Sequence, residues 1–225
     1  MTLGVDVNTT TKILCNKVWE RIPPCLNVVA QILKLPLSLH DKTFYFASNV
    51  THRFVWGAET ARLPFNASRQ LRSAAMRVAW GTKRPWRCTD AVLAFLRKGH
   101  SVDPAQAPDY RALTSITSFL RRNNDWVSFW TDIWDKVYEH PSRTGIVSRF
   151  VLLLRSLHFS MDTPVLVTSS SYPSFSLLET SKAPLFHLYR STIRNRTFLK
   201  ACSSERRDFL EHGCGIVDSY ISCLL

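Results

Sequence analysis

Apolar residues recur at helical spacing along most of the chain. The clearest case is the segment 124–137, NDWVSFWTDIWDKV, in which Trp126, Trp130 and Trp134 stand four residues apart. With the intervening Phe, Ile and Val they follow the pattern of an amphipathic helix, and acidic and polar residues occupy the other face. These rings can form a ligand-binding cluster, a membrane anchor or the packed seam of a helix. The spacing favours the seam.

The same periodicity predicts several more helices, and strand alternation is hard to find before residue 160. Their expected ranges are 18–33, 41–56, 67–80, 89–99, 109–125 and 146–157. We expect the first to be interrupted at Pro23 and Pro24. The second carries an expected apolar face that includes Phe44 and Tyr45.

These helices come in pairs joined by short turns. In the pair within 109–139 the turn is little more than two asparagines. Such a short connection predicts antiparallel packing, which places the tryptophan stripe against Tyr110, Leu113 and Leu120.

A repeat of about 35 residues is also visible. Asp6 and Asp41 stand 35 residues apart, Asp109 follows 68 later, and Trp56 and Trp126 are 70 apart. We therefore expect an all-α chain: a right-handed α-solenoid of about four helix–turn–helix repeats with a poorly ordered or irregular C-terminal region.

Composition changes character in the last third of the chain. Residues 164–186 are rich in Ser, Thr and Pro and predict a linker or short strands. The predicted organisation is thus a helical-repeat domain at 6–160, a linker at 161–187 and a basic C-terminal segment at 188–225.

The formal net charge of +12 favours a polyanionic partner, although a basic surface can also serve solubility alone. The excess is concentrated between residues 69 and 98, where Asp90 is the single acid. The candidates for phosphate contacts in this stretch are Arg72, Arg77, Lys83, Arg84 and Arg87.

Motifs for other chemistry are missing from the sequence. It has no C-x-x-C pair, nucleotide-binding glycine loop, G-x-S-x-G or H-E-x-x-H. His212, Cys214 and Cys223 form at most part of a metal site. We expect a protein that is not an enzyme and that has no cofactor and no metal. No apolar run reaches the roughly 18–20 residues of a membrane span.

Two stretches, 6–22 and 109–137, resemble the pentatricopeptide repeat proteins in their divergent form, which is found among mitochondrial RNA-processing and ribosome-associated factors. The resemblance covers about residues 6–157, and 57–85 fit poorly because of Pro64 and Pro85.

This resemblance implies how bases would be read. In that family a polar residue of the first helix and the last residue of the repeat bond one RNA base. Thr11 and Asp41 occupy these positions, a pair that favours a purine, while Asp41 is also placed to cap a helix. Phe46 stands at the position equivalent to Thr11 in the next repeat, where stacking would replace hydrogen bonding.

Tyr110 and Arg111, on the first helix of the clearest hairpin, are further base-facing candidates. The expected function is therefore binding of single-stranded or ribosomal RNA, alone or with other proteins of a ribonucleoprotein. The expected location is mitochondrial, or otherwise cytoplasmic. The alternative is a helical-repeat scaffold for protein–protein interaction that makes no direct RNA contact.

Overall fold

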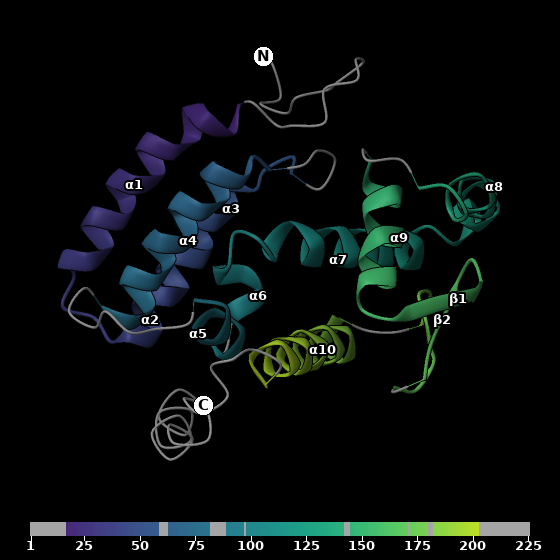
Figure 1. Cartoon of the computed structure of the whole chain (residues 1–225). Coiled ribbons are helices and arrows are strands. Elements are labelled where there is room, and N and C mark those ends of the chain that lie inside the picture. The colour runs from purple at the N-terminus through teal and green to yellow at the C-terminus, as the bar shows by residue number, and fades with distance from the viewer. Residues whose placement is uncertain are drawn as a thin grey trace. The chain divides into compact units, whose positions relative to one another are not determined.

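In the computed structural model (Figure 1) the chain forms two compact units. The structure describes residues 17–58, 63–81, 89–96, 98–141, 145–170, 172–179 and 182–202. One unit, called the helical unit here, contains Val18–Phe54, Phe65–Ala107 and the part of the last helix from Tyr189. The other, the mixed unit, contains the described parts of Val55–Pro64 and Pro108–Leu188.

The helical unit is built around α4, which packs against α1, α2 and α5. Its elements are α1 (Val18–Lys34), α2 (Leu39–Tyr45), the π-helical turn η1 (Phe46–Thr51), α3 (His52–Phe54), α4 (Phe65–Trp80), α5 (Thr89–Phe95), α6 (Gly99–Val102) and the second half of α10 (Lys182–Cys202). Figure 1 shows α1, in purple, beside α4. Four buried alanines on α4 allow this close approach, because they add little side-chain bulk between the helices.

Helix α1 runs through both of its prolines, so the expected interruption is wrong. Without amide hydrogens, Pro23 and Pro24 cannot bond the carbonyls of Trp19 and Glu20. All four residues are solvent-exposed, and water can hydrate those carbonyls. The opposite face, which includes Val18, is buried and holds the helix in place.

The expected apolar face of the second helix is also wrong, because Phe44 and Tyr45 are exposed. The buried stripe is instead Phe46, Val50 and Phe54, which are spaced four residues apart. The π turn between α2 and α3 widens the helix, and polar side chains complete its bonding. The Ser48 hydroxyl, for example, donates to the Phe44 carbonyl at 3.0 Å.

The second half of α10 is held by polar contacts within the helical unit. The buried Tyr189 donates its hydroxyl to the Gln106 carbonyl at 3.3 Å. Arg194 donates to the carbonyls of Ala94 and Phe95 at 3.3 and 3.0 Å, at the C-terminal end of α5. A cation is favourable there because the last carbonyls of a helix lack amide partners. Residues 182–202 form a helix, so the expectation of an irregular C-terminal region is wrong for them.

The mixed unit joins three helices and a small sheet. Its elements are α7 (Ala107–Arg122), the 3-10 turn η2 (Asn124–Trp126), α8 (Val127–Val137), α9 (Ile146–Ser156), β1 (Phe159–Thr163), β2 (Leu166–Ser169), β3 (Phe175–Ser176) and the start of α10. Both α8 and β1 pack against α9.

Two of the three tryptophans, Trp130 and Trp134, are core residues of this unit, at 5% and 4% exposure. Trp130 meets the ring of Phe150 on α9 edge to face, and its indole N–H donates to the Pro164 carbonyl at 2.7 Å. Trp134 stacks on Tyr138 with ring centroids 4.3 Å apart. The seam interpretation therefore holds for these two, although the partners that hold Trp130 come from α9 and the β1–β2 turn, where the sequence led us to expect α7.

The three strands form an antiparallel sheet in the order β1-β2-β3. Phe159 pairs with Ser169 and Met161 with Val167. Phe159 and Met161 are buried while Ser160 and Asp162 are exposed, so alternate residues of β1 face the core.

The chain is thus mostly helical, as expected, but the all-α expectation misses this sheet. Strands β2 and β3 lie in the stretch for which a linker or short strands were predicted, so the short-strand alternative is confirmed there, and β1 precedes that stretch. The sheet's strands of two to five residues are too short to produce a clear alternation in the sequence.

Candidate nucleic-acid interface

Some of the residues expected to contact RNA lie outside the part of the chain that the structure describes. They are Thr11, Lys83, Arg84 and Arg87. The others fall on both units and differ strongly in their surroundings.

Asp41 is exposed on α2 and belongs to a helix cap. The Ser38 hydroxyl accepts the Asp41 amide N–H at 3.2 Å and donates to the Asp41 carboxylate at 2.6 Å. This reciprocal bonding at the start of a helix accounts for an acid at this position.

Phe46 is fully buried in η1, which packs against α1. Its ring offers no face to a base in this conformation, so the expectation of stacking at Phe46 is corrected. The residue is apolar because it belongs to the core stripe of the second helix.

Arg72 is tied to two carboxylates of the helical unit. It forms a bidentate pair with Asp103, at 2.9 and 3.0 Å, and a second pair with Asp90. Asp103 is fully buried and also accepts the Ala105 amide N–H at 2.9 Å. Arg72 therefore fastens α4 to the segments on either side of α6, and its charge is neutralised within the protein. Arg77, one turn beyond it on the same helix, is exposed.

Tyr110 and Arg111 lie in the first turns of α7, in the mixed unit. Tyr110 is half-buried, and this burial raises the pKa of its phenol. The guanidinium of Arg111 lies 5.8 Å from the centroid of the Trp56 ring, a cation–π distance. Trp56 itself is 44% exposed.

A second aromatic group lies at the other end of α7. Phe119, Trp126 and Phe129 are 45%, 50% and 52% exposed, although all three are large and apolar. Trp126 meets Phe119 at 6.0 Å and Phe129 at 5.5 Å between ring centroids, and both contacts are edge to face. Exposed charges of both signs lie near them: Arg121 and Arg122 in the last turn of α7, and Asp125 and Asp132 beside Trp126 and Phe129.

Helix geometry joins these two ends into one surface. Arg111 and Arg122 are eleven residues apart, three helical turns, so they share one face of α7 and lie about 16 Å apart along its axis. The acid in the first turn of α7, Asp109, is paired with Arg149 at 2.7 Å. Asp125, beside Trp126, is an exposed acid at the far end.

We call this surface the α7 stripe. It is defined as Trp56, Arg111, Phe119, Arg122, Trp126 and Phe129. Its arrangement of arginines beside exposed rings matches what single-stranded nucleic acid needs: cations for the phosphates and ring faces for the bases.

Of this stripe, only Arg111 was predicted to be a binding residue. Trp126 and Phe129 were predicted to belong to the buried seam, yet Trp126 lies in the 3-10 turn before α8 begins. The sequence did contain one signal of an exposed aromatic residue at this end of α7. Phe119 is large and apolar, yet it does not belong to the expected apolar face of Tyr110, Leu113 and Leu120.

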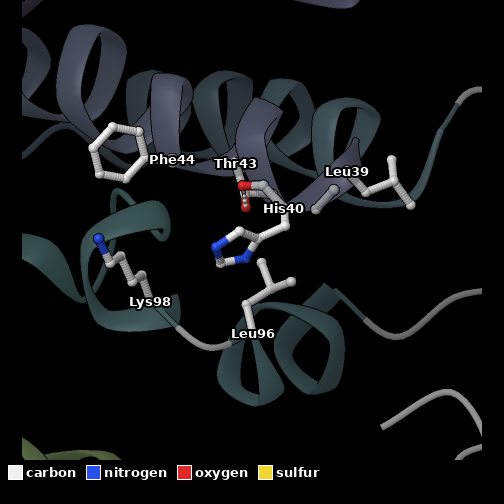
Figure 2. Close-up of a pocket in the computed structure, with 7 residues that line it drawn as sticks. Leu39, His40, Thr43, Phe44, Leu96 and Lys98 are labelled. Carbon is white, nitrogen blue, oxygen red and sulfur yellow. Dashed lines mark hydrogen bonds between the residues drawn. The ribbon is translucent and has the colours of Figure 1, made fainter. Parts of the chain in front are cut away.

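The helical unit also has a small hollow between α2, α4 and the segment that follows α5 (Figure 2). It opens to solvent, and its polar groups include His40 and Lys98. In Figure 2 the ammonium of Lys98 reaches toward Phe44, and it lies 4.4 Å from the centroid of that ring. Lys98 already covers this ring face, and the remaining walls are largely apolar.

Searches of protein-family models, curated proteins and solved structures found no match to this chain. Among the described residues, no three His, Cys, Asp or Glu side chains are grouped closely enough to hold a metal ion. Across the same part of the chain, no helix combines the length and the apolar character needed to span a membrane.

Proposed function

We propose that this protein is a non-catalytic RNA-binding protein and that the α7 stripe is its RNA-binding surface. The observation that carries the proposal is the exposed aromatic group beside arginines, in a chain with a net charge of +12. The cations attract any polyanion, and the rings add a contact that only accessible bases satisfy.

The wider setting belongs to the same proposal. We propose further that the helices form a helical-repeat solenoid and that the protein is related to pentatricopeptide repeat proteins. We also propose that it acts in mitochondrial RNA metabolism or in a ribonucleoprotein. In its support, consecutive helices of the helical unit contact one another, as α1 does α2 and α4 does α5. The basic charge is the other support.

One observation favours the alternative, a scaffold for protein partners. Around the α1–α2 connection of the helical unit a group of large apolar side chains is exposed: Leu35, Leu37, Leu39, Phe44 and Tyr45. Exposed apolar groups of this kind are common at protein interfaces. This surface includes the hollow of Figure 2.

The test measures the affinity for a labelled single-stranded RNA of mixed sequence as a function of NaCl concentration. The variant is Arg122→Glu, and it is compared with Arg77→Glu, which changes the exposed phosphate candidate of the helical unit. Both arginines are exposed in the last turn of a 16-residue helix, and both substitutions change the net charge equally.

We expect Arg122→Glu to weaken binding more and to reduce the slope of log affinity against log salt by about 0.7 for each phosphate that the variant no longer neutralises. If the two substitutions weakened RNA binding equally, the α7 stripe would no longer be proposed as the RNA-binding surface. If the parent protein binds no RNA even at low salt, RNA binding is excluded and the protein-interaction scaffold remains as the proposed function.

A further inference from the structure

We infer that the α7 stripe selects unpaired RNA and that the group of Phe119, Trp126 and Phe129 is a stacking platform for its bases. The inference rests on the proposed function and adds the class of RNA and the mode of contact. It follows from how the rings meet, where they lie and what surrounds them.

The ring contacts leave most ring faces uncovered by one another. Trp126 meets Phe119 at an interplanar angle of 71° and Phe129 at 86°. An edge-to-face contact covers one face of one ring only. Three rings have six faces in all, so the two contacts cover two of them. Trp134 and Tyr138 differ, because they stack at an angle of 30° and cover each other's faces.

The three rings also lie where a ligand can reach them. They come from three consecutive elements: α7, η2 and α8. Each keeps about half of its surface accessible, whereas Trp130, one turn after Trp126, is 5% exposed. When a flat apolar ligand covers exposed rings of this size, the removal of their apolar surface from water lowers the free energy.

The charge beside the rings indicates the identity of that ligand. An apolar protein surface would also cover the rings, but the exposed guanidinium groups of Arg121 and Arg122 offer an anion two cations, which Asp125 and Asp132 oppose in part. A nucleic acid offers phosphates and flat bases together. In a duplex the base faces are buried against each other, and only an unpaired strand presents them to a platform. Charge and ring geometry together therefore select the unpaired strand.

A second anchor lies at the other end of α7. The Arg111 guanidinium lies by the Trp56 ring, about 16 Å along the helix from Arg122. A strand that stacks on the platform can follow the face of α7 toward the Arg111 cation, which already covers one face of the Trp56 ring. Purines stack more strongly than pyrimidines, so the platform favours adenine-rich over uridine-rich strands by a modest factor.

The test compares three labelled ligands of equal length, about 10 nucleotides. They are an oligoadenylate, the same strand annealed to its complement, and a strand of equal charge whose central nucleotides are abasic. The parent protein and Trp126→Ala are titrated with each, and Phe129→Ala is the second platform variant. Trp19→Ala is the matched control, because Trp19 is 41% exposed on α1 of the helical unit.

We expect the parent to bind the oligoadenylate more tightly than the duplex or the abasic strand. Trp126→Ala and Phe129→Ala should each lose about tenfold in affinity for the oligoadenylate, or about 1.4 kcal/mol. Neither should change the affinity for the abasic strand, and Trp19→Ala should bind all three ligands like the parent. In the parent, tryptophan fluorescence should be quenched by the oligoadenylate, and Trp126→Ala should lose that quenching.

Two outcomes overturn the inference, and they differ in what they say of the proposed function. If both platform variants bind the oligoadenylate like the parent while Arg122→Glu still weakens binding, stacking is excluded and RNA binding by the stripe remains. If the parent binds none of the three ligands at low salt, both proposals fail, and the rings are left as a docking surface for a protein.

Discussion

Arg72 and Arg194 of the helical unit and Arg122 of the mixed unit lie in opposite surroundings. In the helical unit, the bonds of Arg72 and Arg194 are internal, to carboxylates and to carbonyls at a helix end. In the mixed unit, Arg122 is exposed beside rings that are themselves half exposed. The basic stretch that is most prominent in the sequence is therefore partly neutralised within the protein. A count of basic residues overestimates the charge available to a polyanion.

The mixed unit contains the same contrast within one helical segment. Trp126 and Trp130 are four residues apart, yet one is 50% exposed and the other 5%. Trp130 is buried because Phe150 and the Pro164 carbonyl meet its ring and its indole N–H. Partners from elsewhere in the chain, which periodicity does not reveal, decide which ring belongs to the core.

The largest expected effect separates these two tryptophans. Trp130→Ala should lower the free energy of unfolding by about 3–5 kcal/mol, because it leaves a cavity and an unbonded carbonyl. Trp126→Ala should change it by no more than about 0.5 kcal/mol. Urea unfolding of both variants measures the difference. Equal losses would mean that Trp126 is a core residue and not part of a binding surface.

A smaller difference is expected between two arginines of α4. Arg72→Ala should lower the free energy of unfolding by about 3 kcal/mol, because it leaves the buried Asp103 carboxylate without its cation. Arg77→Ala, at an exposed position, should change it by no more than about 0.5 kcal/mol. Urea unfolding measures both. An Arg72→Ala protein as stable as the parent that binds RNA more weakly would return Arg72 to the phosphate-binding residues.

The smallest expected effect concerns pH and the helical unit. Burial, together with the charges of Arg190 and Lys98, lowers the pKa of His100 from 6.5 to about 4. The unfolded chain thus takes up a proton near pH 6.5 and the folded chain only near pH 4. The contribution of His100 to stability is complete above pH 6.5 and is lost as the pH falls toward 4.

Between pH 7 and pH 4 this loss should amount to about 1–2 kcal/mol after allowance for solvent screening. Urea unfolding of the parent and of His100→Gln at both pH values measures it as the difference between the two proteins. An identical pH dependence would show that His100 titrates as it does in water.

Local patterns predicted most of the helices. Good helix formers mark α4, and the Asn-Asn turn marks the end of α7, so both helices lie close to their expected ranges. The π turn was not predictable from periodicity, because it shifts the buried stripe from Phe44 to Phe46 within a single turn. The short strands of the sheet are held by their packing on α9, a long-range effect that a local pattern does not contain.

Of the candidate site, only Arg111 was predictable. The charge pattern directed attention to Arg72, whose partner Asp103 is 31 residues away in the sequence. Trp126 and Phe129 fit an apolar helical stripe, and hydrophobic periodicity alone does not tell an exposed ring from a buried one. Only the three-dimensional position of α9 makes that distinction.

Ultraviolet cross-linking of the full chain to single-stranded RNA, followed by tryptic digestion and mass spectrometry, tests the central claim most directly. Cleavage after Arg122 and Lys136 releases residues 123–136, which contain Trp126 and Phe129. The α7 stripe predicts RNA attached to this peptide at Trp126 or Phe129, and loss of the adduct in the Trp126→Ala, Phe129→Ala double variant. Adducts confined to peptides of α1 to α4, with none in 108–136, would contradict it.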